Sequence, residues 1–200
     1  MQAIKTIAQL EALYGAPVPA AITKVAPHLT PLYQQWIGAS RFVILSSVGP
    51  NGTDGSPRGD RGPVVHLVDR QTIWLPDWMG NNRIDSLRNI VEDGRVSLLF
   101  MVPGSLNVVR VNGRAELNAS PEATEQFEKD GKQPKTVIVI TVQEVYFQCA
   151  KALMRSNLWN ASADAPRVPT AGAFIKERQA EFDADAYDAG YEAYAADRMW

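Results

Sequence analysis

The chain has 200 residues, of which 46% are hydrophobic, 8% aromatic and 21% charged. This length suits one domain or two small ones, and the composition can bury a sizeable core, which excludes a chain disordered throughout. The formal net charge of -2 provides no general attraction to nucleic acid or to an anionic membrane. One cysteine and two histidines exclude an internal disulfide framework and argue against a cysteine-rich or histidine-based metal site.

The first residues, MQAIKTIAQLEALYG, do not resemble a signal peptide, because charges interrupt the apolar stretches. No window approaches the ~18–20 apolar residues that a membrane span requires. We therefore expect a cytoplasmic protein that binds neither a membrane nor nucleic acid.

The first forty residues are predicted to be helical. Apolar residues recur at helical spacing over residues 2–14, and a glycine ends that helix. Residues 20–25 allow a second short helix. Thr30 and Pro31 are typical of an N-cap and a first helical position, which predicts a third helix through Ile37.

The middle of the chain consists of short β-branched and apolar runs separated by turn residues. The predicted strands cover residues 41–48, 56–60, 63–68, 72–75, 95–102, 106–117 and 136–142. Helices predicted at residues 83–92 and 121–130 interrupt them. Strands at such close intervals predict a closed antiparallel barrel rather than a doubly wound parallel sheet.

After residue 145 the chain is predicted to be helical or irregular, with a linker rich in Pro, Ala and Asp near residues 160–171. The tail places Tyr187, Tyr191 and Tyr194 at positions i, i+4 and i+7, which is typical of a helix face docked on another surface. We divide the chain into a helical N-terminal segment (1–40), a barrel domain (41–160), and a linker with a C-terminal helix (161–200) docked on the barrel or on a partner subunit.

Between residues 55 and 115 every basic residue is an arginine. These are Arg58, Arg61, Arg70, Arg83, Arg88, Arg95, Arg110 and Arg114. A planar guanidinium binds phosphate or carboxylate through two parallel hydrogen bonds, which the compact ammonium of lysine does not. For any single arginine, an ion pair on a solvated strand edge is the alternative.

The segment PDWMGNNRIDSLRNI, residues 76–90, predicts a strand, a turn and the start of a helix. With Asn82 as N-cap, Asp85 falls at the third helical position and forms a capping-box-like pair. A helix start attracts anions, and Arg83 and Ser86 project from the same side of its first turn. This set suits a phosphate monoester, and plain helix capping with an exposed Arg83 is the alternative.

The segment SPRGDRGP places Ser56, Arg58 and Asp60 on one face if it is extended. Its glycines, including Gly59, would let a flat ligand approach the backbone; an ordinary glycine-rich loop is the alternative. In VVRVNGRAEL, residues 108–117, apolar and polar positions alternate, so one face belongs to the core. The other meets water, a ligand or a partner subunit.

Several motifs are absent: the phosphate-binding loop, the dinucleotide-binding glycine fingerprint and the nucleophile elbow of hydrolases. His66 lies in an apolar run and is interpreted as a packed or rim histidine. Cys149 lies among apolar residues and is expected to be buried and inert. Any redox chemistry would then have to come from a bound cofactor.

Four segments together resemble the pyridoxamine 5'-phosphate oxidase-like, FMN-binding split-barrel family. They are SSVGPNGTDGSPRGD, IWLPDWMGNNRIDSLRNIVEDGRVSLLFMVPG, VVRVNGRAEL and QCAKALMRSNLW, and they span roughly residues 40–160. The resemblance implies a β-rich α+β fold: a six-stranded antiparallel split β-barrel with peripheral helices. It also implies a homodimer with two FMN molecules at the subunit interface.

The same resemblance assigns cofactor-binding roles. The FMN phosphate would lie at Arg83, assisted by Arg58 beside Gly59, with Asn82 and Ser86 nearby, and Pro76 and Asp77 along the ribityl chain or ring. Arg110 would come from the facing strand, in one arrangement across the dimer interface, and Lys151, Arg155 and Trp159 would close the site. The C-terminal signature that recognises pyridoxal phosphate in the vitamin B6 oxidase is missing, so we do not expect oxidation of pyridoxamine phosphate.

These observations predict a homodimeric FMN-dependent oxidoreductase that uses a small-molecule electron donor or substrate and no metal. The catalytic residues and the substrate are left open. Two alternatives remain: a reductase that uses the deazaflavin F420, and a non-catalytic flavin-binding or flavin-storage protein.

Overall fold

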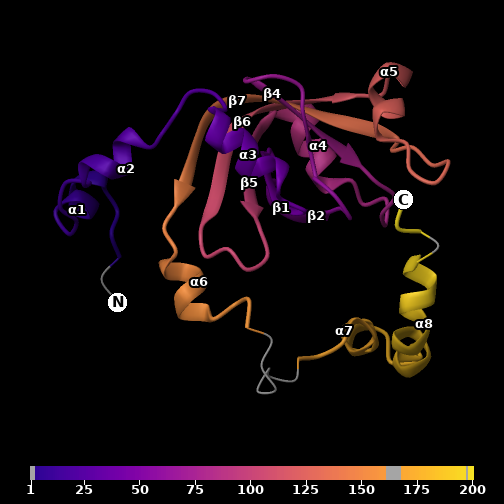
Figure 1. The fold of residues 1–200 in the computed structure, drawn as a ribbon. Coiled ribbons are helices and arrows are strands. Elements are labelled where there is room, and N and C mark those ends of the chain that lie inside the picture. Colours follow the sequence, from indigo (N-terminus) through magenta and orange to yellow (C-terminus); the bar gives the residue numbers. More distant parts are fainter. Residues whose placement is uncertain (1–2, 161–167, 197) are drawn as a thin grey trace.

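The computed structural model describes residues 3–160, 168–196 and 198–200, and its centre is one strongly curved antiparallel sheet (Figure 1). Its strands are β1 (Phe42–Gly49), β2 (Gly52–Gly59), β3 (His66–Leu67), β4 (Thr72–Asp77), β5 (Arg95–Met101), β6 (Val108–Asn118) and β7 (Thr136–Gln148). Hydrogen-bonded neighbours follow the order β2-β1-β5-β6-β7-β4-β3. The predicted antiparallel split barrel with peripheral helices is confirmed, and the two-residue β3 adds a seventh strand to the expected six.

Strand β2 is longer than its sequence pattern indicates. It forms a hairpin with β1 through the predicted turn, where Gly52 has a φ of +122° that favours glycine. Pairing begins directly at this turn, with Gly52 opposite Gly49 and Thr53 opposite Val48. Residues 53–55 are polar or small, so they carry no strand signal of their own; β1 supplies their hydrogen-bond partners.

Strands β3 and β7 also differ from prediction. Of the predicted strand 63–68 only two residues are β3, because Pro63 has no N–H and the Val64 N–H donates to the Ser40 carbonyl (2.9 Å) outside the ladder. Strand β7 continues to Gln148 rather than ending at residue 142. A β-bulge opposite Asn112 and Gly113 of β6 leaves Gln143 of β7 without a partner, resets the register and lets the pairing continue.

The core fills the inside of the curved sheet. Its largest fully buried side chains include Phe100, Leu98, Leu45, Ile73 and Ile138, from β5, β1, β4 and β7. Alternating strand positions supply these side chains, as the buried positions of β5 show. Burial of apolar area at about 25 cal/mol/Å² is the main term that stabilises such a core.

The N-terminal helices are α1 (Ile7–Glu11), α2 (Pro19–Thr23) and α3 (Pro31–Gly38). Helix α3 begins as predicted, with Thr30 as N-cap, and it buries Ile37. Helix α1 is much shorter than the predicted helix 2–14. Helices α1 and α2 extend away from the barrel in Figure 1, and α1 buries no residue, so no tertiary packing lengthens it.

The two helices inside the barrel domain are α4 (Asp85–Glu92) and α5 (Pro121–Thr124), the latter continued by the 3₁₀ turn η1 (Glu125–Phe127). Helix α4 packs on β1, β2 and β6. The predicted helix 121–130 ends early, because Glu128 has an extended ψ of 131°. Asp130 and Gly131, both with positive φ, then turn the chain back on itself.

The C-terminal helices are α6 (Lys151–Ser156), α7 (Ala171–Arg178) and α8 (Ala184–Ala196). Helices α7 and α8 pack on each other and lie apart from the barrel, while the end of the chain returns to it (Figure 1). Tyr191 and Tyr194 stack along α8 and stay half-exposed, so docking of this stripe remains a prediction. Most of the predicted linker 160–171 lies outside the described residues. Among the described helices, none is both long and apolar enough to cross a membrane.

Candidate functional site

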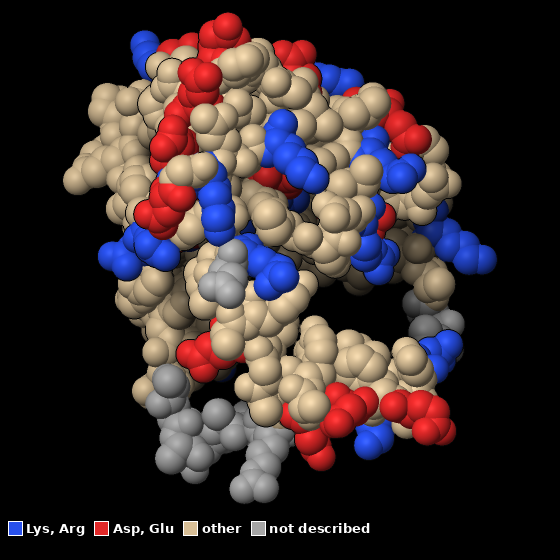
Figure 2. Space-filling view, turned by 90° about the vertical axis from the view of Figure 1, so that its right-hand side faces the viewer, with Lys and Arg blue, Asp and Glu red and all other residues tan. Residues whose placement is uncertain are grey.

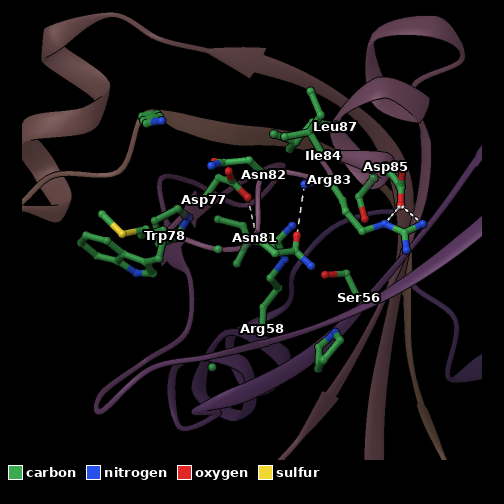
Figure 3. Close-up of a pocket in the computed structure, with 18 of the residues that line it drawn as sticks. Ser56, Arg58, Asp77, Trp78, Asn81, Asn82, Arg83, Ile84, Asp85 and Leu87 are labelled. Carbon is green, nitrogen blue, oxygen red and sulfur yellow. Dashed lines mark hydrogen bonds and ion pairs between the residues drawn. The ribbon is translucent and has the colours of Figure 1, made fainter. Parts of the chain in front are cut away.

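A pocket of about 1000 Å³ lies at the split of the barrel. One wall is β2; the other is the end of β4 with the loop that leads into α4. These two strands are far apart in the strand order, so the pocket opens between two parts of the sheet that are not hydrogen-bonded neighbours. Further lining comes from Lys132, Gln133, Lys135 and the returning C-terminal residues Met199 and Trp200. Figure 3 shows Arg58 of β2 and Asp77 of β4 among the lining residues.

An ion pair crosses this split. Arg58 of β2 donates through Nη1 to Oδ1 of Asp77, the last residue of β4. The two side chains are only 19% and 18% exposed. The Nε atom of Arg58 is fully buried and has no hydrogen-bond partner within the described part of the chain. A buried guanidinium donor without an acceptor costs free energy, so this position favours an anionic or strongly polar ligand.

The predicted capping box is wrong. Helix α4 begins at Asp85, and its N-cap is Ile84, which has a φ of +54°. Asn82 also has positive φ, so the chain enters the helix through two left-handed residues and the Asn82 side chain makes no cap. A β-branched residue in this region is strained. The strain marks a loop whose shape is fixed by its surroundings rather than by local preference.

Arg83 therefore precedes the helix and does not project from its first turn. Its side chain is 75% exposed and pairs with Asp85, with 2.9 Å between Nη2 and Oδ2. Its backbone N–H donates to Oδ1 of Asn81 (3.1 Å). The Arg83 guanidinium can thus reach a ligand only by leaving Asp85 or by sharing it.

Ser86 is buried at the start of α4, where its hydroxyl donates to the Asp54 carboxylate of β2. The expected anion site at this helix start therefore faces two carboxylates, Asp54 and Asp85. The pocket lining carries charges of both signs. Its cations are Arg58, Arg83, Lys132 and Lys135, and its carboxylates are Asp54, Asp77 and Asp85. Figure 2 shows the corresponding face of the molecule, with Lys and Arg side chains in its middle.

The structure brings seven of the eleven predicted cofactor-binding residues together in this pocket. They are Arg58, Gly59, Pro76, Asp77, Asn82, Arg83 and Ser86. Their common origin is the β2 strand and the strand–loop–helix unit around residues 76–86, the two segments whose motifs suggested the site.

The other four predicted residues do not line the pocket within this chain. Arg110 of β6 donates to the hydroxyl of Tyr146 (3.2 Å) on β7. Trp159 donates its indole N–H to the Ser105 carbonyl (2.6 Å), while Lys151 and Arg155 are exposed on α6. Lys151 and Arg155 thus lie on α6, Trp159 contacts the β5–β6 connection, and Arg110 faces β7.

Sequence reasoning missed Trp78 as a direct pocket wall, and it missed Lys132, Lys135, Tyr191, Met199 and Trp200. Trp78 follows Asp77 directly and could have been found from that position. Tyr191 was interpreted only as part of a docked helix face. Lys132, Lys135, Met199 and Trp200 carry no motif, because only tertiary folding brings them to the split.

Cys149 is exposed, contrary to expectation, because β7 extends to Gln148 and carries Cys149 beyond the core. His66 on β3 contacts the rings of Trp74 and Phe127, with centroid separations of 6.2 and 6.4 Å. It is an exposed rim histidine outside the pocket. The described lining of the pocket contains neither histidine nor cysteine.

Several solved structures are similar to part of this chain. A variant of HupZ from Group A Streptococcus is 18% identical, covers 60% of this chain and 99% of its own, and has a TM-score of 0.50. An FMN-binding protein from Syntrophomonas wolfei is 14% identical, with coverage of 58% and 88% and a TM-score of 0.43. General Stress Protein 26 from Bacillus anthracis is 13% identical, with coverage of 57% and 88% and a TM-score of 0.43.

No curated protein matches the chain. A sequence profile of the family described as Pyridoxamine 5'-phosphate oxidase (PNPOx_N) matches residues 29–149, which is more than half of the chain. The match includes every strand of the barrel and the segments on both sides of the pocket. The chain therefore belongs to the pyridoxamine 5'-phosphate oxidase family.

Proposed function

We propose that this protein binds FMN in the pocket at the split of the barrel and acts as an oxidoreductase. The observation that carries the proposal is the Arg58 guanidinium, which lies in a pocket of about 1000 Å³ with its Nε buried and without an acceptor among the described residues. The family membership and the similar fold of a protein named as FMN-binding support the choice of ligand.

The pocket suits a ligand with an anionic end and a flat end. Arg58 and Arg83 line the part next to α4, where N–H groups of the first helical turn lack partners within the helix. Both guanidinium groups form ion pairs with carboxylates, Arg58 with Asp77 and Arg83 with Asp85. A bound phosphate would replace the Asp77 and Asp85 carboxylates as the partner of these two arginines.

The remaining length of the pocket is less polar. Pro76, Trp78 and Met79 follow β4 and form a mixed apolar and aromatic wall. The volume is at the upper end of the range of about 300–1000 Å³ that is usual for ligand pockets, which leaves room for a dinucleotide-sized or flavin-sized molecule.

Bound FMN would supply the two-electron redox chemistry. The described lining offers arginines, lysines, amides and aspartates, without histidine or cysteine, so we assign this chain's residues to binding and orientation. The guanidinium groups hold the anionic end, and the aromatic wall excludes water from one side of the ring.

We further propose that the second group of predicted residues, Arg110, Lys151, Arg155 and Trp159, reaches the pocket of a partner subunit in a homodimer. Mixing Arg58→Ala and Arg110→Ala subunits tests this: if Arg110 acts in trans, random exchange restores roughly a quarter of the sites. If Arg110 acts within its own chain, no site is restored.

The function is tested by titrating the purified protein with FMN and following flavin fluorescence. Arg83→Ala should weaken FMN binding by about tenfold, because a charged hydrogen bond to phosphate is lost. The matched control is Arg88→Ala, an exposed residue of α4 that does not line the pocket. Equal losses in both variants, or no binding by the unmodified protein, would refute the proposal.

A further inference from the structure

The end of the chain forms part of the pocket. Trp200 lines it together with Met199, and its side chain is buried, with the residue only 7% exposed. The Trp200 ring meets the Trp78 ring edge-to-face, at a centroid separation of 5.2 Å and an interplanar angle of 76°. Two indoles, one directly after β4 and one at residue 200, thus build one corner of the site.

Cations fix Trp200 in this position. The Lys129 ammonium lies 4.6 Å and the Arg61 guanidinium 5.2 Å from its ring centroid. Lys129 is itself held by an ion pair with the buried carboxylate of Asp60. Because each of these contacts favours the same ring position, the corner is a built feature of the barrel and not a loose end of chain.

Both indole donors in this corner lack acceptors. The Nε1 atoms of Trp78 and Trp200 are fully buried, and neither finds a hydrogen-bond partner among residues 3–160, 168–196 and 198–200. Buried Trp N–H groups are normally paired, so two orphaned donors on one pocket wall point to an acceptor-bearing ligand. Flat heteroaromatic rings with carbonyl and ring-nitrogen acceptors have this chemistry.

The C-terminal arm, which consists of α7, α8 and residues 198–200, meets the barrel at this corner. Helices α7 and α8 pack on each other. They lie apart from the barrel in Figure 1, and Figure 2 shows an opening between the two bodies. Tyr191 of α8 and residues 199–200 line the pocket, so the arm is anchored where the ligand would bind.

We propose that Trp200 and Trp78 bind the planar ring of the ligand, and that Trp200 is a specificity-determining residue contributed by the C-terminal arm. This inference rests on the proposed function, because it assigns the ring of FMN to the indole corner and its phosphate to Arg58 and Arg83. Ring recognition and anion recognition are then separate parts of one site.

Three probes separate these parts: FMN, lumiflavin (the ring without the ribityl phosphate) and inorganic phosphate as a competitor of FMN. Trp200→Ala should weaken both FMN and lumiflavin by about tenfold and leave phosphate competition unchanged. Trp200→Phe keeps an aromatic ring and removes the N–H donor, so its affinity for both flavins should lie between those of the unmodified protein and Trp200→Ala. Arg83→Ala should weaken FMN but not lumiflavin. Phe174→Ala, an exposed aromatic of α7, is the matched control and should change nothing.

The outcomes distinguish the two proposals. FMN binding that is insensitive to Trp200→Ala overturns the ring assignment and leaves the FMN function standing. Lumiflavin binding that is sensitive to Trp200→Ala, without FMN binding, supports the ring assignment and refutes the FMN function. If the unmodified protein binds neither flavin, both proposals fail. Circular dichroism of each variant shows whether it has folded.

Discussion

The ion pair between Arg58 and Asp77 should affect stability and ligand binding in different ways for its two partners. It joins β2 to β4 across the split, with both side chains about four-fifths buried. Arg58→Ala leaves a largely buried carboxylate without its cation. Asp77→Asn leaves the arginine free and keeps a hydrogen-bonding amide in its place.

Breaking a fully buried ion pair costs about 3–5 kcal/mol. Here each side chain keeps nearly a fifth of its exposure, at 19% and 18%, so water screens part of the interaction. We expect Arg58→Ala to lower the free energy of unfolding by about 2–3 kcal/mol, and the double-mutant cycle to give a coupling energy of about 1–2 kcal/mol.

Ligand affinity should move in opposite directions. Arg58→Ala removes the cation that the phosphate would use, so FMN should bind at least about tenfold more weakly. Asp77→Asn removes the competing carboxylate and should tighten FMN binding by about three- to tenfold. Urea unfolding of the four proteins of the cycle gives the stabilities, and fluorescence titration gives the affinities. A weaker affinity in Asp77→Asn would refute the idea that Asp77 occupies the place of the ligand anion.

Two further predictions concern the barrel. The Arg95 side chain donates to Asp93 and lowers the pKa of that carboxyl from 3.8 to about 2. Because the folded pKa is the lower one, this stabilisation is present above pH 3.8 and lost as the pH falls towards about 2, so urea unfolding of Asp93→Asn should show a deficit at neutral pH that disappears near that value. Gly113→Ala at the β-bulge would place Cβ 2.2 Å from the Thr141 carbonyl oxygen, and thermal unfolding should show a loss of about 2–3 kcal/mol. Gly55→Ala, with open space around its Cβ, is the control; equal losses in both would contradict the packing argument.

The features that were predictable from the sequence are those that local chemistry determines. Thr30 and Pro31 begin α3, and the Gly49–Gly52 turn joins β1 to β2, because both depend on a few neighbouring residues. The short spacing between strands predicted the antiparallel barrel, because short connections join neighbouring antiparallel strands. The end of β7 was not predictable, since its last residues are strand only because β6 pairs with them across the bulge.

The site shows the same division. Arg58 and Asp77 were predicted from separate motifs, and the fold brings them together at the split. Asn82 has the chemistry of a good N-cap but lies in a left-handed turn that the surrounding structure imposes, so the cap was wrongly placed. Trp200 was missed because its partners, Trp78, Lys129 and Arg61, are distant in sequence.

The most direct test of the account is to add FMN to the purified protein, remove free flavin by gel filtration, and record the visible absorption spectrum with the protein concentration. We predict that FMN elutes with the protein at close to one molecule per chain, and that Arg58→Ala elutes without it. Folded protein that elutes without flavin, or retention unaffected by Arg58→Ala, would contradict the assignment of the barrel split as a flavin nucleotide site.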